Sequence, residues 1–400
     1  MKSLPLKYVA KINAGQSPPS AEVSDLADDL PFLQGNAEFQ TEHPLPRFQC
    51  ATAPKAARVG DILISVRAPV GALNVADRRY GIGRGLCAIT PSDCDGRFLW
   101  WWLHAQRARL NAVSTGTTYR AVTAEDVGGL PFPQLDIAEQ RRIAKFLDGE
   151  AARIDKLLTL LKELLAKLGE RETAELDVAI DDLADRFGTA PLRRFIWAAD
   201  QGVSPQCDGV PADEGEWGVL KVSCLRPGIF IPEENKRLPE GTEPATNSEV
   251  REGDLLITRA NTPQLVGSTA VVPRVRRKLL LPDKIFRIRL AEGMHPEFIA
   301  TIARGSHIRA LCAASSNGAS QSMANIRFEE VKGWPIPAIR ADEQLKFIKR
   351  TSHRRERINA LRPAVDRQLN LLTERRQALI TAAVTGQIDV STASGRGIEE

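Results

Sequence analysis

Residues 131–172 read PFPQLDIAEQRRIAKFLDGEAARIDKLLTLLKELLAKLGERE and open the longest helical pattern in the chain, which extends to Leu183. Apolar side chains recur there every seven positions, with leucines at the intervening position: Leu147, Ile154, Leu161 and Leu168, then Leu157 and Leu164. This is the a/d pattern of a coiled coil, and it predicts one long amphipathic helix with a buried seam. Such a helix needs a partner.

A second pattern of the same kind occupies residues 335–384. Its predicted seam is Ile358, Val365, Leu372 and Leu379, with Leu361 between. Moving the first pattern by 204 positions places Glu139-Gln140 on Glu343-Gln344, which indicates an internal duplication. Two such helices returning antiparallel bury each other's seam and set a fixed distance between the parts that they join.

The sequences before the two helices also repeat. Gly15-x-Ser17-Pro18 recurs as Gly202-x-Ser204-Pro205, and GDILIS at 60–65 recurs as GDLLIT at 253–258. Short β-branched runs predict strands, and residues 97–113 predict a helix. We therefore expect an α+β fold with two mixed α/β domains, two long antiparallel coiled-coil helices and a pseudo-two-fold internal repeat. The expected boundaries are 1–133 and 188–339 for the two domains, 134–187 and 340–386 for the two helices, and 387–400 for a tail.

The helix ends carry local signals. Asp136 with Glu139 three residues later predicts a capping box, and Asp342 is the expected cap of the second helix. Pro363 is expected to kink that helix or to mark its true start.

Composition narrows the function classes. The net charge of +4 and the pI near 8.7 permit a polyanionic partner without requiring one. The N-terminus has no apolar signal region and no apolar run is long enough to cross a membrane, so we expect a cytoplasmic chain. Six cysteines without a C-x-x-C pair are interpreted as packing residues.

No catalytic motif stands out. A phosphate loop is absent, and Gly81-x-Gly83-x-Gly85 lacks the dinucleotide-binding spacing. The loop with which amino-methyltransferases hold a flipped base is absent as well. A weak metal-nuclease reading rests on Asp283 and Glu330, which have simpler roles at a turn and a helix start. Trp100, Trp101 and Trp102 are interpreted as core rather than a base-stacking platform.

Polar and basic side chains on predicted loops are the candidate DNA-binding residues, because Arg suits guanine and phosphate while Asn and Gln suit adenine. Taken singly, each is more often a solvated surface residue. The candidates are Arg67, Arg84, Thr117, Thr118, Tyr119, Arg120, Arg259, Asn261, Arg276, Arg277, Lys278, Gln321 and Asn325.

Several stretches, taken in order, resemble the specificity subunit of type I restriction-modification systems. They are GDILISVRAPVG with IGRGLCAI, STGTTYRAVTAEDV, LPFPQLDIAEQRRIAKFLDGEAARIDKLL and LLTERRQALITAAVTGQIDV. The resemblance covers nearly the whole chain. The second helix departs from it, reading IRADEQLKFI where the family has EQ followed by R-x-I and an aspartate.

The resemblance implies two target recognition domains that each read one half of a split, asymmetric DNA sequence. It implies helices that act as a spacer and dock two modification subunits, with restriction subunits joining the full complex. This chain would then be non-catalytic and hold no cofactor. S-adenosylmethionine would belong to the N6-adenine methyltransferase subunit, and ATP and Mg²⁺ to the restriction subunit.

Two other functions remain open at this point. One is a non-catalytic coiled-coil adaptor whose globular domains bind protein instead of DNA. The other is an enzyme that acts alone, which DNA with S-adenosylmethionine or Mg²⁺ would reveal.

Overall fold

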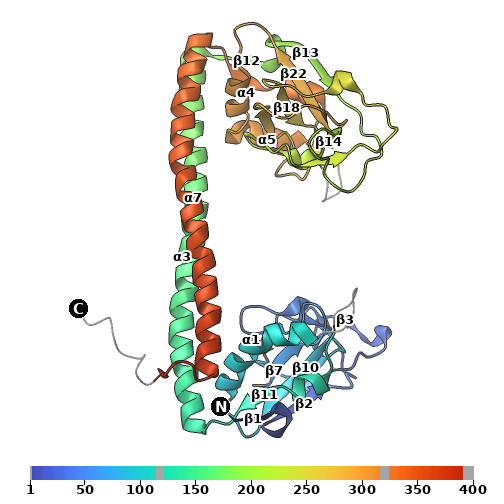
Figure 1. The fold of residues 1–400 in the computed structure, drawn as a ribbon, viewed down its shortest axis with the longest axis vertical. Coiled ribbons are helices and arrows are strands. Elements are labelled where there is room, and N and C mark those ends of the chain that lie inside the picture. Colours follow the sequence, from blue (N-terminus) through green and yellow to red (C-terminus); the bar gives the residue numbers. More distant parts are fainter. Residues whose placement is uncertain (1, 114–120, 316–323, 391–400) are drawn as a thin grey trace, which may run out of the picture. The chain divides into compact units, whose positions relative to one another are not determined.

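The computed structural model describes residues 2–113, 121–315 and 324–390. The chain forms two compact units: unit 1 is Met1–Lys162 with Asp366–Glu400, and unit 2 is Glu163–Val365. Two long helices, α3 (Ile137–Phe187) and α7 (Ala341–Val384), contribute a part to each unit. Within each unit the two helices lie side by side and run in opposite directions (Figure 1).

Unit 1 is built on a four-stranded antiparallel sheet in the order β2-β10-β7-β8. Its strands are β2 (Ala10–Ala14), β7 (Ile62–Ser65), β8 (Leu73–Val75) and β10 (Leu86–Pro91). A five-stranded sheet of short strands has the order β3-β5-β4-β9-β6. These are β3 (Ser24–Asp25), β4 (Pro31–Leu33), β5 (Phe48–Gln49), β6 (Ala56–Ala57) and β9 (Tyr80–Ile82). The pair β1 (Ser3–Pro5) and β11 (Pro131–Pro133) joins the N-terminus to the segment before α3.

Helix α1 (Gly96–Val113) packs beside the α3/α7 pair, and α2 (Ala124–Gly128) follows it (Figure 1). All three tryptophans of α1 are buried, which confirms the prediction that they are core. Trp102 packs against Phe132 with ring centroids 5.0 Å apart, while Trp101 Nε1 donates to Asp148 Oδ1 of α3 at 2.8 Å. They are buried on different sides because α1 is covered by both the sheet and the long helices.

Unit 2 contains a four-stranded antiparallel sheet in the order β13-β22-β18-β20. Its strands are β13 (Ile196–Gln201), β18 (Leu255–Thr258), β20 (Thr269–Val271) and β22 (Ile285–Leu290). Smaller sheets join β12 (Thr189–Pro191) with β24 (Pro335–Pro337), β19 (Ala260–Asn261) with β23 (Ala324–Asn325), β15 (Leu225–Arg226) with β16 (Ile229–Phe230), and β14 (Gly218–Leu220) with β17 (Asn235–Arg237) and β21 (Leu279–Leu280). The helices are α4 (Pro296–Ile302), α5 (Ser306–Ser315) and α6 (Phe328–Lys332).

The same local connections occur in both units at positions that repeat in the sequence. Gln140 is buried, accepts a hydrogen bond from Asp95 N at 2.8 Å and donates to Leu135 O at 2.9 Å. Gln344 is also buried, accepts from His295 N at 2.9 Å and donates to Ile339 O at 3.0 Å. In each unit, a glutamine in the first turn of a long helix therefore fixes the start of the neighbouring helix.

The predicted coiled-coil seam is only partly correct. Leu147 and Ile154 are buried, but the intervening leucines Leu157, Leu164 and Leu361 are 48%, 44% and 52% exposed. Burial along the helices is most complete where α1 or α4 lies against them, since two helices alone cover only a narrow stripe of each other. The residues that recur every seven positions fill that stripe. The prediction that Leu157, Leu164 and Leu361 are buried between them is wrong.

The predicted helix ends have mixed outcomes. Asp136 Oδ1 accepts from Glu139 N at 2.7 Å and so caps α3, which is the first half of the predicted capping box, while the Glu139 carboxylate pairs with Arg142. Asp342 does not cap α7, because the helix already begins at Ala341 and Gln344 N donates to Arg340 O at 3.0 Å. Pro363 lies inside α7, so it is not the start of the helix. Tertiary contacts outweigh the low helix propensity of proline at this position.

The architecture is mixed helix and sheet with long helices, in agreement with the predicted α+β class. No helix among the described residues is long and apolar enough to span a membrane.

Candidate DNA interface

The repeated Gly-x-Ser motif fixes the end of one strand against a turn in each unit. A Cβ on Gly15 would lie 2.2 Å from Gly83 O, and one on Gly202 would lie 1.6 Å from Leu281 O. Only glycine allows these approaches. The serine two residues later accepts a backbone hydrogen bond from that turn: Ser17 Oγ from Arg84 N at 3.4 Å, and Ser204 Oγ from Asp283 N at 3.3 Å.

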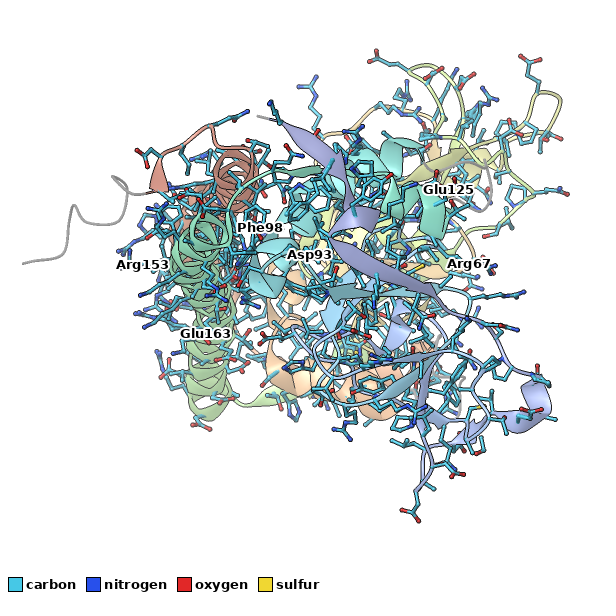
Figure 2. The ribbon with its side chains drawn as sticks, turned by 90° about the horizontal axis from the view of Figure 1, so that it is seen from below. Arg67, Asp93, Phe98, Glu125, Arg153 and Glu163 are labelled. Carbon is cyan, nitrogen blue, oxygen red and sulfur yellow. The ribbon has the colours of Figure 1, made fainter. Side chains whose placement is uncertain are left out.

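In unit 1 this turn borders an open cavity of about 570 Å³. Its lining mixes polar and apolar side chains and includes the predicted residues Arg67 and Arg84, which come from different parts of the sequence. Both are exposed. Figure 2 shows Arg67 on the side of unit 1 away from Arg153 of α3. The remaining lining residues are Ser17, Pro18, Ser20, Val23, Ser24, Asp25, Phe32, Gln34, Gly35, Asn36, Phe48, Ser65, Ala68 and Gly85.

The two cavity arginines are available to a ligand. Within residues 2–113, 121–315 and 324–390, neither Arg67 nor Arg84 has a side-chain hydrogen bond or ion pair to another residue. Asp25 is the one carboxylate among the lining residues of the cavity. Two free guanidinium groups over an open polar cavity suit phosphate oxygens or the guanine edge.

The predicted loop of Thr117, Thr118, Tyr119 and Arg120 lies outside the described residues, but the residue that follows it is placed. Ala121 pairs with Arg67 in an isolated antiparallel bridge, and Val122 N donates to Val66 O at 2.9 Å. The chain therefore returns from this loop directly beside Arg67.

Unit 2 builds the corresponding edge from the corresponding segments. Ala260 pairs with Asn325, Asn261 pairs with Ala324, and Ile326 N donates to Arg259 O at 2.9 Å. The predicted residues Arg259, Asn261 and Asn325 are thus brought together. Arg259 and Asn325 are exposed, and Asn261 Nδ2 is buried with no hydrogen-bond acceptor among the residues that the structure describes. Gln321 lies outside the described residues.

The predicted basic cluster at 276–278 divides into two kinds of side chain. Arg276 donates to Glu216 O at 2.8 Å, and Lys278 Nζ donates to Gly215 O at 2.6 Å. These two cations therefore fix the loop at 212–216. Arg277 is exposed and remains the member of the cluster that is available to a phosphate.

The acids of the weak nuclease reading have structural roles. The side chains of Asp283 and Ser204 are hydrogen-bonded to each other. Glu330 accepts from Arg327 N at 2.7 Å at the start of α6. In the described part of the chain, no group of three or more His, Cys, Asp or Glu side chains is arranged to hold a metal ion.

The cysteines have the character of packing residues. All six are free, and Cys50, Cys87, Cys224 and Cys312 are buried. Burial raises the pKa of the Cys87 thiol to about 11, so it is neutral at pH 7 and a poor nucleophile.

Sequence reasoning missed the other polar residues of the cavity, chiefly Gln34, Asn36 and Ser20. Gln34 follows the apolar run at 31–33, which is a strand-end signal. Nothing local connects it with Arg84, because the two meet through a parallel pairing of β4 with β9.

Comparison with known proteins shows what the N-terminal part of the chain is similar to. Residues 1–169 match the family model described as the type I restriction modification DNA specificity domain. Two curated relatives carry matching names. The MjaX type I restriction enzyme specificity subunit of Methanocaldococcus jannaschii is 36% identical over 155 residues, 38% of this chain and 36% of the relative. The EcoEI specificity subunit of Escherichia coli is 34% identical over 159 residues, 39% of this chain and 27% of the relative.

The matched segments thus span about a third of the length of these curated relatives. A solved chain from work on complex assembly and conformational transition of the type I R-M system is similar in structure to nearly the full length of this chain. It covers 97% of this chain and 98% of its own length, with a TM-score of 0.69 and 18% identity. At that identity the match shows a shared fold over the whole chain.

Proposed function

We propose that this chain is the DNA sequence-specificity subunit of a type I restriction-modification complex. Each globular part reads one half of a bipartite, asymmetric DNA target. The observation that carries this is the open cavity in the family-matched domain, which Arg67 and Arg84 both line without a side-chain partner among the described residues. The corresponding edge of unit 2, with Arg259, Asn261 and Asn325, supports a second reading site.

The two sites belong to an internal repeat with pseudo-two-fold symmetry. In support, both four-stranded sheets have the same strand order, and Gln140 and Gln344 make corresponding hydrogen bonds. The globular parts differ in sequence. The backbone N–H that donates to the serine of the Gly-x-Ser motif belongs to Arg84 in unit 1 and to Asp283 in unit 2. We therefore expect the two half-sites to differ. The proposed boundaries remain 1–133, 134–187, 188–339, 340–386 and 387–400.

In this proposal the long antiparallel helices are a coiled-coil spacer and the dock for two modification subunits, with restriction subunits completing the complex. Glu170 with Arg171, and Glu374 with Arg375, are exposed and offer charged docking positions. The chain itself is non-catalytic and holds no cofactor. S-adenosylmethionine is bound by the modification subunit, and ATP and Mg²⁺ by the restriction subunit.

Salt dependence distinguishes DNA reading from the adaptor alternative. Contacts from Lys and Arg to phosphates release counterions, so the affinity for duplex DNA falls steeply as salt rises. We expect the chain in complex with its modification subunits to lose DNA affinity by about a thousandfold or more between 50 and 200 mM salt. Affinity that is absent, or independent of salt, would favour a protein-binding adaptor.

A further inference from the structure

The Gly81-x-Gly83-x-Gly85 motif brings a second segment against the cavity turn. A Cβ on Gly83 would lie 3.0 Å from Gln34 O and 3.2 Å from Gln34 Cα. A Cβ on Gly85 would also lie 3.0 Å from Gln34 O. Both glycines therefore permit the backbone of Gln34 to pack directly on the turn that carries Arg84.

Strand pairing fixes this arrangement. β4 and β9 are parallel neighbours with Phe32 opposite Gly81 and Leu33 opposite Ile82, and Gly83 N donates to Leu33 O at 2.8 Å. Gln34 follows directly at the end of β4. Its backbone position is therefore set by sheet hydrogen bonds on a rigid element, which is what a side chain needs for selective recognition.

The Gln34 carboxamide is free to bind. It is exposed, lines the cavity together with Arg84, and has no hydrogen-bond partner in the part of the chain that the structure describes. The nearby Gln49 is different, because its Oε1 accepts from Ala27 N at 2.7 Å and from Asp29 N at 2.9 Å. The Gln49 side chain thus stabilises the loop at 27–29, whereas the fold positions only the backbone of Gln34.

We propose that Gln34 is a specificity-determining residue whose carboxamide hydrogen-bonds to a base edge in the half-site read by unit 1. A carboxamide presents a donor and an acceptor together and matches adenine N7 and N6 in the major groove. Arg84 lies next to it and contacts the neighbouring guanine edge or phosphate. This assignment rests on the proposed function.

The test compares methylation motifs in cells. Wild-type chain, Gln34→Ala, Gln34→Glu and the control Gln134→Ala are each co-expressed with the modification subunit in a methylation-free host, and N6-methyladenine is mapped across the genome. Gln134 is exposed and lies outside the cavity lining. Gln34→Glu keeps the size of the side chain but removes its donors.

Both Gln34 variants should lose roughly 5- to 150-fold of the discrimination at one base pair of one half-site. The other half-site and the Gln134→Ala motif should be unchanged. A wild-type motif that both Gln34 variants reproduce without change would overturn this assignment and leave the proposed function standing. A wild-type complex that yields no motif would overturn the proposed function, and the assignment with it.

Discussion

Replacement of Glu172 on α3 tests how much a partly buried charge cluster contributes to the stability of unit 2. Its carboxylate is 18% exposed and meets three arginines. Arg304 forms a direct ion pair with it, while Arg355 and Arg362 lie 3.7 and 3.8 Å away on α7. Arg304 is 13% exposed, and burial together with the charge of Arg355 lowers the pKa of its guanidinium to about 10. Glu172 is therefore the counterion that offsets the cost of burying these cations.

Replacing Glu172 by Gln leaves mostly buried guanidinium groups without a counterion. Breaking a buried pair by removing one partner costs about 3–5 kcal/mol, and the residual exposure here favours the lower end, about 3 kcal/mol. For a unit of this size, each kcal/mol shifts the Tm by about 2–4 °C. We therefore expect Glu172→Gln to lower the Tm of unit 2 by about 6–12 °C in scanning calorimetry of the full chain.

Glu175→Gln is the matched control, one turn further along α3. Glu175 pairs at 2.7 Å with Arg171, whose side chain is 74% exposed, in an i,i+4 arrangement. Such pairs contribute about 0.3–0.5 kcal/mol. A Tm for Glu172→Gln within about 2 °C of that for Glu175→Gln would refute the idea that the arginine cluster depends on this carboxylate.

Three further outcomes follow from contacts within unit 1. Gln140→Ala should lower the free energy of unfolding by about 1–3 kcal/mol in urea titrations, because it leaves Asp95 N and Leu135 O without partners; an effect no larger than that of Gln134→Ala would contradict this. Gly15→Ala should cost about 1–3 kcal/mol because its Cβ meets Gly83 O, whereas Gly149→Ala has open space in α3 and should be neutral or stabilising; equal effects would show that the turn yields freely. His104 has its pKa lowered to about 4 by burial and by Arg376, Arg107 and Arg97, so only the unfolded chain gains a proton as the pH falls below about 6.5. Stability should therefore fall by up to about 3 kcal/mol between pH 6.5 and 4, and His104→Phe should remove that part of the slope in pH-dependent unfolding.

Features with a local cause could be predicted from the sequence. The long helices follow from heptad periodicity, and the Asp136 cap and the strand at 62–65 follow from short-range signals. The exposure of Leu157 could not be predicted in this way, because it depends on how much of the helix the rest of unit 1 covers. The heptad pattern says only that the residue can be buried.

The candidate site shows the same limit. Arg67 and Arg84 were found from residue type and loop position, but their meeting at one cavity depends on the fold. Gln34 was missed because its link to Arg84 is the parallel pairing of β4 with β9, between segments far apart in the sequence. Arg276 and Lys278 were assigned to DNA by charge, yet their side chains donate hydrogen bonds to carbonyl groups of the loop at 212–216, far away in the sequence.

The most direct test of the account is the methylation pattern that the unmodified chain confers. Co-expressed with its modification subunit in a methylation-free host, it should produce a split motif with one N6-methylated adenine in each half, on opposite strands. A folded, co-purified complex that leaves the genome without any such motif would contradict the claim that this chain reads DNA sequence.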